Sequence, residues 1–352
     1  MRVAVAMSGG VDSSVAAYIL KEEGHDVFGI TMAVIPGYSC QAKKRTEDII
    51  SDAKKVADRL GIEHHVLDLR ENFQREVIDY FAAEYKAGRT PNPCVMCNRK
   101  IKFGDLFDEA RRLGAEYIVT GHYGRIERDD QGRALLMKAG DSKKDQTYFL
   151  YNIRRENLDY IMMPLKDYSK DQVRKIGEKI GLEISEKPDS EEICFIPDED
   201  HARFIEEDLG EESLAGDFVD REGNFLARHK GLIHYTIGQR RGLGVALGRR
   251  IYVVDIIPEK NQVVLGDEGD IFKSKLYAKD VNLLALDELP ESLEAKAKIR
   301  STAREEDVVV KPYRDGMLVE FKEPQRAITK GQAIVLYDGD LVLGGGTIDR
   351  IY

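Results

Sequence analysis

Short apolar runs and amphipathic stretches alternate from the start of the chain to residue 120. Residues 3–7 form an apolar run typical of a buried strand, and residues 11–20 carry apolar side chains at helical spacing. The same alternation predicts strands at 25–32, 63–69 and 117–120 and helices at 46–60, 72–87, 103–113 and 165–181. Such alternation is typical of an α/β fold, with helices covering both faces of a parallel sheet and ligands at the carboxyl ends of its strands.

After residue 210 the pattern changes to short β-type runs. Glycine, proline, aspartate and asparagine separate these runs, which lie at 231–238, 251–257, 262–265, 294–299, 317–321, 333–337 and 341–343. Short strands in this number, without helical stretches between them, predict a small central domain followed by a β-barrel. We therefore expect three domains, with bounds at 1–205, 206–272 and 273–352.

Composition is that of a globular protein with a substantial core, since 42% of the 352 residues are apolar and 33% are charged. No apolar run is long enough to predict a membrane span, and the chain opens on a strand rather than a signal sequence. Its four cysteines are too few for a disulfide framework and favour thiols with a chemical task. We therefore expect a cytoplasmic location.

The net charge of −10 conceals two basic islands. Residues 223–254 and residues 85–104 contain no aspartate or glutamate, while each interval carries several lysines and arginines. The first interval includes Arg240 and Arg241 within the glycine-rich sequence 238–244. Local basic islands in an acidic chain favour contacts with a nucleic-acid backbone, although a solvated charged surface would give the same pattern.

The residues that join the first strand to the first helix are the strongest candidate for a ligand site. Paired glycines let a phosphate approach the backbone at the positive end of a helix, and nearby serines add hydroxyl donors. We expect Asp12 to hold a magnesium ion that bridges to the phosphates, because a bare carboxylate would repel them. The candidate contacts are Ser8, Gly9, Gly10, Asp12, Ser13 and Ser14.

Other strand ends add to this candidate nucleotide site. Met32, Gly121 and His122 lie at or just past predicted strand ends and are expected near the nucleotide. For Met32, packing in the core is as good an explanation as contact with adenine. The loop is not a Walker A motif, since no lysine follows Gly10. An ordinary strand-to-helix turn without a ligand is the alternative.

Three cysteines form a second group of candidate residues. Cys94 and Cys97 have the C-x-x-C spacing that suits a metal or a redox pair. They lie in a segment, 88–103, that is expected between two helices, where Pro91 and Pro93 stop any helix and hold the preceding residues extended. Nearby arginines and lysines are expected to favour the thiolates. Cys194 lies between apolar residues and is a disulfide partner, a third metal ligand or a buried structural thiol.

Several motifs, spread over the whole chain, resemble one known family. The sequence 8–13, Ser-Gly-Gly-Val-Asp-Ser, resembles the signature of the PP-loop ATP pyrophosphatases. Together with 90–98, 120–123, 144–146, 189–196 and 238–244, it is similar to the bacterial tRNA-specific 2-thiouridylases. The resemblance implies a PP-loop catalytic domain, a small central domain and a C-terminal β-barrel.

The resemblance also implies a reaction. ATP, with magnesium, adenylates the C2 oxygen of the wobble uridine in glutamate, glutamine and lysine tRNAs, and sulfur then replaces that oxygen. Cys194 carries a persulfide delivered by a cysteine desulfurase or a sulfur-relay protein, and Cys97 is the second catalytic thiol. Asp12 is a catalytic residue of the ATP site. The residues implied in tRNA binding are Asn92, Pro93, Cys94, His122, Lys144, Asp145, Gln146, Arg240, Arg241, Arg300 and Gln332.

One departure from the family leaves the sulfur chemistry open. Many members have aspartate where this chain has Cys94, so Cys94, Cys97 and Cys194 are also candidate ligands of a 4Fe–4S cluster with one open iron site. Two other classes of function remain alternatives: another PP-loop adenylating enzyme, and a metal- or cluster-stabilised RNA-binding protein without catalysis.

Overall fold

The computed structural model describes residues 1–38, 40–182, 193–196, 198–246 and 248–352. The chain divides into two compact units. Unit 1 comprises Met1–Ile78, Cys94–Pro197 and Gly339–Leu343, and unit 2 comprises Asp79–Pro93, Asp198–Asp338 and Gly344–Tyr352.

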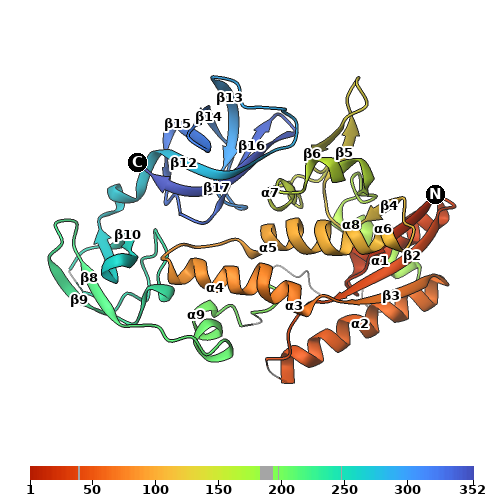
Figure 1. The fold of residues 1–352 in the computed structure, drawn as a ribbon, viewed down its shortest axis with the longest axis horizontal. Helices are drawn as coiled ribbons and strands as arrows, with labels where there is room; N and C mark the ends of the chain where they lie inside the picture. The colour runs from red at the N-terminus through yellow and green to blue at the C-terminus, as the bar shows by residue number, and fades with distance from the viewer. Residues whose placement is uncertain (39, 183–192, 197, 247) are drawn as a thin grey trace. The chain divides into compact units, whose positions relative to one another are not determined.

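Unit 1 is built on a parallel sheet in the order β3-β2-β1-β4-β7 (Figure 1). Its strands are β1 (Arg2–Ala6), β2 (Asp26–Ala33), β3 (Glu63–Asp68), β4 (Tyr117–Val119) and β7 (Ile161–Met162). The sheet confirms the α/β fold, because the pairs β1–β2, β2–β3, β1–β4 and β4–β7 are all parallel. The carboxyl ends of the strands therefore meet at one edge, where ligands bind in such folds.

Alternation along β1 explains how helices come to cover the sheet. Val3 and Val5 are fully buried and point to one face, where they share a core with α1 (Val11–Glu22), α2 (Cys40–Leu60) and α8 (Lys170–Lys179). Ala4 points to the opposite face, since successive side chains of a strand alternate. The helix predicted at 46–60 is thus confirmed as the core of a longer helix, and that predicted at 165–181 is confirmed as a shorter one.

The helix predicted at 72–87 consists of α3 (Arg70–Phe73), a π-helical stretch (Gln74–Ile78) and α4 (Asp79–Lys86). A second helical run is made of α5 (Pro93–Met96), a π-helix (Cys97–Asp105) and α6 (Leu106–Arg112). Residues 89–92 lie outside any helix, as the prolines predict, but the prediction that the whole segment 88–103 lies between two helices is wrong, because residues 93–103 are helical. Pro93 occupies the first helical position, where a missing N–H costs nothing and the fixed φ favours helix.

A hairpin in unit 1 was not predicted. β5 (Arg125–Arg128) pairs antiparallel with β6 (Ala134–Met137), and Leu341 pairs with Met137. Between this hairpin and β7 lie α7 (Thr147–Leu150) and a 3₁₀ turn (Arg155–Tyr160). Each strand of the hairpin is only four residues long: β5 is mostly charged, whereas β6 is apolar throughout, so neither strand shows the apolar–polar alternation of a half-buried strand.

The first part of unit 2 contains a sheet in the order β10-β11-β8-β9. Its strands are β8 (Gly216–Val219), β9 (Phe225–His229), β10 (Tyr252–Ile257) and β11 (Gln262–Gly266). The strands predicted at 251–257 and 262–265 are confirmed, but the one at 231–238 is wrong. A 3₁₀ turn (Leu232–His234) lies there; within it Ile233 is buried, and Tyr235, just after the turn, packs in the core with Val253 and Ile256 of β10.

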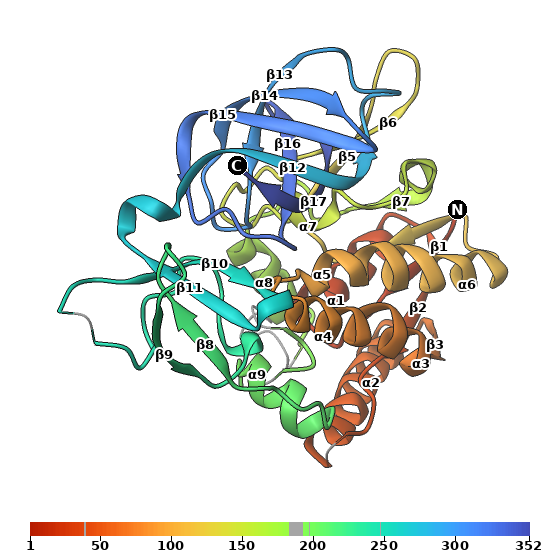
Figure 2. The ribbon, with the colours of Figure 1, turned by 60° about the vertical axis from the view of Figure 1, so that its left-hand side comes forward.

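The last part of unit 2 is a closed β-barrel, which Figure 2 shows as strands wrapped around a common interior. The barrel order is β12-β15-β14-β13-β16-β17, and pairing of β12 with β17 closes it. Its strands are β12 (Phe272–Leu283), β13 (Leu293–Lys298), β14 (Glu306–Tyr313), β15 (Gly316–Arg326), β16 (Ala333–Asp338) and β17 (Leu341–Ile351). The predicted C-terminal barrel is confirmed, whereas the exact domain bounds stay a prediction.

Candidate functional site

The segment between β1 and α1 folds into a tight loop held by serine side chains. The Ser8 amide donates to Ser13 Oγ at 3.2 Å, and Ser13 Oγ donates to the Gly10 carbonyl at 3.2 Å. Ser14 Oγ donates to the same carbonyl at 2.8 Å. Ser8 is exposed, and the loop leads directly into the positive N-terminal end of α1. This arrangement can hold a phosphate on backbone amides and hydroxyls.

Two glycines let the loop pack closely against its neighbours. Gly9 has a φ of +69°, and a Cβ there would lie 2.9 Å from Asp52 Cβ. At Gly121, just past β4, a Cβ would lie 2.7 Å from the Ser13 nitrogen and 2.9 Å from Asp12 Cβ. Side chains do not fit at such distances. The structure therefore places Gly121 directly against the loop, at the strand end where it was expected.

Asp12 is paired inside the protein. Lys170 Nζ donates to both carboxylate oxygens of Asp12, at 2.8 and 2.7 Å, and the Tyr123 hydroxyl donates to Oδ1 at 2.9 Å. Lys170 is 8% exposed and Tyr123 is 3% exposed. Because an ammonium already occupies both oxygens, the carboxylate does not fit the magnesium site expected for it.

Met32 is half-buried one residue before the end of β2, opposite Leu67 of β3. Its neighbour Thr31 donates to the Met7 carbonyl at 2.9 Å and lies 2.9 Å from His64 Nε2. This polar contact fixes the end of β2. Met32 thus lies at the carboxyl edge of the sheet, where it was expected, and its contact with adenine stays a prediction.

The three candidate cysteines lie together in unit 1. Cys94 and Cys97 are on the helical run that begins at Pro93; Cys94 is exposed, while Cys97 and Cys194 are half-buried. Although part of each side chain reaches solvent, desolvation by the surrounding protein raises the pKa of the Cys97 thiol to about 11. Desolvation, with the neighbouring sulfurs of Cys97 and Cys94, raises the pKa of Cys194 to about 12.

The expectation that basic residues give thiolates of low pKa is therefore wrong for this conformation, since desolvation outweighs the nearby positive charge. Desolvation raises the pKa of Cys94 as well, and Lys102 opposes the rise at all three sulfurs. Lys102 lies five residues after Cys97 in a π-helix. Hydrogen bonds in a π-helix join residues five apart, so that lysine is brought toward the side of the helix that carries Cys97.

Only one of the three cations that follow Cys97 is available to the sulfurs. Arg99 donates to Asn152 Oδ1 at 2.9 Å, and Lys100 pairs with Glu76 at 3.6 Å. Lys102 Nζ instead lies 3.3 Å from His122 Nε2 and makes no ion pair with any carboxylate in the part of the chain that the structure describes. Among the residues that the structure describes, no carboxylate therefore compensates the positive charge of Lys102.

His122 has both ring nitrogens engaged. An ammonium can only donate, so His122 Nε2 accepts from Lys102, and Nδ1–H is left to donate to Thr120 Oγ1 at 2.9 Å. Desolvation, together with the Lys102 charge, holds the pKa of His122 well below its usual value. The imidazole is therefore neutral, and its Nε2 holds the Lys102 ammonium in place as a hydrogen-bond acceptor. Contact between His122 and a tRNA base would require this pair to open, and stays a prediction.

The cysteines are not arranged as a ready-made cluster site. Within the described ranges, no group of three or more His, Cys, Asp or Glu side chains is arranged to hold a metal ion. Residues 189–192, the first part of the motif around Cys194, lie outside the described residues.

The segment 144–146 supports the strand-end loop of unit 1. Asp145 accepts from the Ala139 amide at 3.0 Å and from Thr147 Oγ1 at 2.7 Å. Gln146 Oε1 accepts from the Tyr123 amide at 2.9 Å, which fixes the residue that holds Asp12. Lys144 is half-buried. Asp145 and Gln146 therefore have structural contacts, and the predicted role of all three in tRNA binding stays a prediction.

The predicted tRNA contacts of unit 2 fall into two kinds. Arg240, Arg241 and Arg300 are exposed, and none of them forms an ion pair with another described residue. The turn that presents the first two is held by Gln239, whose side chain accepts from the Thr236 amide at 3.0 Å and donates to the Arg241 carbonyl at 3.1 Å. A held turn with two free guanidinium groups suits a phosphate backbone.

Gln332 belongs to the second kind. Its Nε2 donates to the carbonyls of Thr90 and Pro91, at 2.9 and 3.3 Å, and so holds the segment before the C-x-x-C motif. Pro93 is buried and Asn92 half-buried. The amide of Gln332 is thus already engaged in positioning this segment, and its predicted tRNA contact remains untested.

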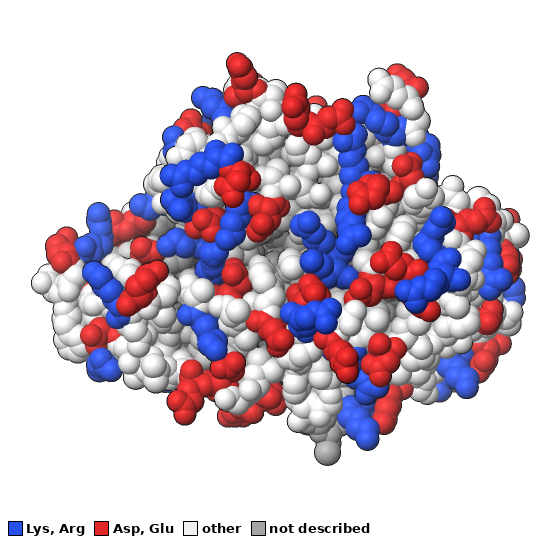
Figure 3. All heavy atoms as spheres, viewed as in Figure 1, with Lys and Arg blue, Asp and Glu red and all other residues white. Residues whose placement is uncertain are grey.

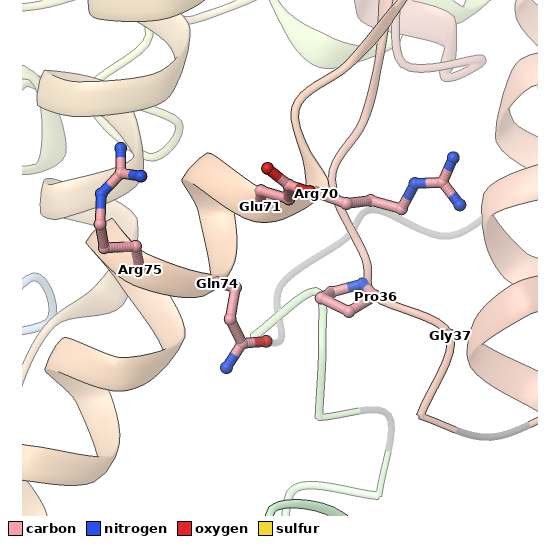
Figure 4. Close-up of a pocket in the computed structure, with 6 residues that line it drawn as sticks. All are labelled: Pro36, Gly37, Arg70, Glu71, Gln74 and Arg75. Atoms are coloured by element: carbon pink, nitrogen blue, oxygen red, sulfur yellow. The ribbon is translucent and has the colours of Figure 1, made fainter.

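Charged side chains of both signs are interspersed over the face drawn in Figure 3. A cavity of about 370 Å³ in unit 1 is lined by Pro36, Gly37, Arg70, Glu71, Gln74 and Arg75. Figure 4 shows Arg70 and Arg75 extending in opposite directions, and they pair with Asp68 and Glu76 respectively. The lining includes none of the predicted site residues.

No helix among the residues that the structure describes is long and apolar enough to cross a membrane.

Sequence reasoning missed Lys170 and Tyr123, and did not single out Lys102 within its basic island. Tyr123 falls in the matched motif 120–123, so its position two residues after Gly121 was the available signal. Lys170 lies 158 residues from Asp12, and no local pattern marks it. Pairing over such a separation becomes visible only in the folded chain.

Three family models cover almost the whole chain. They are a tRNA methyl transferase HUP domain at residues 1–198, a tRNA methyl transferase PRC-barrel domain at 202–267 and an aminomethyltransferase beta-barrel domain at 273–348. The three matches follow the same order as the parallel sheet, the small central sheet and the barrel.

Relatives that match over their full length identify the family more specifically than the three domain models do. The tRNA-specific 2-thiouridylase MnmA 1 of Clostridium tetani is 53% identical over 99% of this chain and 97% of its own length. The tRNA-specific 2-thiouridylase MnmA of Clostridioides difficile is 47% identical over 99% of this chain and 98% of its own length.

Among solved structures, the tRNA thiolase NcsA of Methanococcus maripaludis, with its 4Fe–4S cluster, is 20% identical, with a TM-score of 0.36. The match covers 55% of this chain and 61% of that one, and is too weak to carry the cluster over. The identity to full-length relatives decides the matter: this chain belongs to the family of tRNA-specific 2-thiouridylases.

Proposed function

We propose that this protein is an ATP-dependent sulfurtransferase that replaces the C2 oxygen of the wobble uridine with sulfur in lysine, glutamate and glutamine tRNAs. The observation that carries the proposal is that one unit holds both a phosphate loop closed by Gly121 and a group of cysteines beside one uncompensated lysine. Identity to the clostridial thiouridylases supports the same substrate class. Because tRNA and ATP are cytoplasmic, so is the proposed reaction.

The first step activates the base. The C2 oxygen of uracil is a poor leaving group, and its attack on the α-phosphate of ATP forms an adenylated base and releases pyrophosphate. Ser8, Ser13 and the backbone of Gly9 and Gly10 are placed to hold the departing phosphates at the start of α1. The oxygen can then leave as part of AMP.

The second step delivers sulfur. Cys194 receives a persulfide from a cysteine desulfurase or a sulfur-relay protein, and its terminal sulfur attacks C2 as AMP departs. The Cys97 thiolate then attacks Cys194 Sγ, which releases 2-thiouridine and leaves a disulfide between Cys97 and Cys194. A dithiol reductant supplies two electrons to restore both thiols. Lys102 favours anionic sulfur at Cys97 and Cys194, and Arg45 adds to its effect at Cys194.

The persulfide route is preferred to a cluster because the described side chains include no ready-made metal site. An anaerobic preparation, assayed for iron and acid-labile sulfide, separates the two routes. Unmodified tRNA is incubated with ATP, cysteine and a cysteine desulfurase, and its nucleosides are analysed by mass spectrometry.

We expect 2-thiouridine, with one AMP and one pyrophosphate per base, from protein that contains no iron. Activity that rises in proportion to iron content would replace the persulfide route with a cluster of Cys94, Cys97 and Cys194. Absence of 2-thiouridine from every preparation would overturn the proposed function itself.

The tRNA surface has a separate test. The double variant Arg240→Ala/Arg241→Ala should weaken tRNA binding and lower the slope of log affinity against log salt by about 2, since about one counterion is released per phosphate contact. Arg249→Ala is the matched control, because Arg249 already pairs with Asp267. Equal effects of the two changes would show that the 240–241 turn does not contact the RNA backbone.

A further inference from the structure

The phosphate loop carries a buried ion pair that the expected magnesium chemistry does not explain. Asp12 lies in the first turn of α1, where an acidic side chain suits the helix dipole. Lys170 is the first residue of α8, where the same dipole disfavours a positive charge, and it is 92% buried. Such a lysine is stable there only if it is paired, and Asp12 provides that pair.

The contacts around this pair join three elements of unit 1. Lys170 comes from α8, Asp12 from α1, and Tyr123, which donates to Asp12 Oδ1 at 2.9 Å, follows β4. Gly121 packs on the backbone between Asp12 and Ser13. Consequently, the position of the loop depends on a polar contact that reaches across the sheet edge.

We propose that Lys170 is a positioning residue of the ATP site, and that Asp12 acts through Lys170 and Tyr123 rather than as a ligand of magnesium. Lys170 neutralises Asp12, so the carboxylate does not repel the polyphosphate, and it anchors the first turn of α1 so that the loop amides face the ligand. This inference rests on the proposed use of ATP. It departs from the magnesium role that the motif implies.

The charges give a distinctive test. In Lys170→Met the Asp12 carboxylate loses its cation beside the phosphates, whereas in Asp12→Asn/Lys170→Met neither charge remains. The affinity for ATP is measured by calorimetry, with and without MgCl₂ and without tRNA. We expect Lys170→Met to weaken ATP binding by about tenfold or more and the double variant to recover most of that loss.

Asp12→Asn distinguishes the two roles of the carboxylate. If Asp12 acts through Lys170, the MgCl₂ concentration that gives half-maximal ATP binding stays the same in Asp12→Asn as in the unchanged protein. A tenfold rise in that concentration, or a double variant that binds ATP no better than Lys170→Met, would overturn the proposal.

Further measurements separate positioning from a merely structural effect. Lys170→Met should raise KM for ATP more than it lowers kcat for tRNA thiolation, whereas partial unfolding would lower kcat alone. Lys175→Met is the matched control, because Lys175 is exposed on the same helix, and its ATP affinity and Tm should not change. Thiolation that does not depend on ATP would refute the proposed function. The ATP affinities of Lys170→Met and of the double variant would still show whether the ion pair positions the loop.

Discussion

The phosphate loop and the cysteine region of unit 1 differ in how their charges are balanced. At the phosphate loop Asp12 is paired with a buried ammonium and accepts a hydrogen bond from a buried hydroxyl, so the charge of its carboxylate is balanced before any ligand arrives. At the cysteines, the Lys102 ammonium is hydrogen-bonded to a neutral imidazole, and the thiols around it are protonated at neutral pH. The cysteine region thus carries an unused positive charge.

This difference indicates what each region is ready to bind. A neutral, closely packed loop offers backbone amides and hydroxyls in fixed positions and needs no rearrangement of charge to accept phosphates. The positive charge of Lys102 beside protonated thiols is balanced when one sulfur becomes anionic. A persulfide ionises more readily than a thiol, so the region should favour the sulfur-loaded form over the empty one.

The largest effect should come from removing a sulfur. Cys97→Ser and Cys194→Ser should each lower tRNA thiolation by on the order of a thousandfold or more, because in the proposed reaction each sulfur forms covalent bonds. ATP binding, measured by calorimetry, should be unchanged in both, since the loop and the cysteines do not share charges.

A serine variant at either position that also lost ATP binding would break the separation between the two regions. Cys94→Ser is a useful companion. Under the persulfide route it should keep most of the activity, whereas a cluster would be lost with any one of the three ligands.

The second effect should fall on the loop alone. Gly121→Ala would place a Cβ 2.7 Å from the Ser13 nitrogen, and backbone cannot easily move away. Overpacking of this kind costs about 1–3 kcal/mol, so ATP affinity should fall by about tenfold or more. Alkylation of the cysteines by iodoacetamide should continue at the original rate.

Gly269→Ala is the control, because no atom lies within 4 Å of its added Cβ and its backbone is not left-handed. Unchanged ATP affinity in Gly121→Ala would mean that the loop can shift without losing affinity, and that its close packing against residue 121 does not matter for ATP binding.

How far each region follows from sequence differs for a physical reason. The loop is local: strand, paired glycines and helix lie within 22 residues, so the pattern alone predicts its backbone and the nearby strand end at Gly121. For the cysteine region the sequence predicts only that the cation belongs to the basic island 85–104. Which of Arg99, Lys100 and Lys102 acts on the sulfurs depends on which of them is hydrogen-bonded or ion-paired to other residues, and those residues lie on other elements.

The errors have the same origin. Asp12 was given a metal because its partner Lys170 lies far along the chain, and the thiols were given low pKa values because sequence shows nearby charges but not desolvation. The helix that begins at Pro93 was missed for a different reason. Proline was taken as a helix breaker, although at the first helical position it is favourable.

The smallest effect should come from Lys102. Because its charge opposes the rise in thiol pKa, Lys102→Met should raise the pKa of Cys97 further, and the thiolate fraction at pH 8 should fall. Iodoacetamide alkylation of Cys97 at pH 8, followed by peptide mass spectrometry, should slow by about threefold to tenfold, with the rate still rising as pH increases.

Lys100→Met is the control for this prediction. Because Lys100 is ion-paired with Glu76, its substitution should leave the alkylation rate of Cys97 unchanged. Lys102→Arg should keep much of the original rate, because the positive charge is retained even if the contact with His122 changes. Equal rates in Lys100→Met and Lys102→Met would mean that the surrounding protein, rather than one lysine, sets the ionisation of the sulfurs. The contrast with the neutral loop would then rest on desolvation alone.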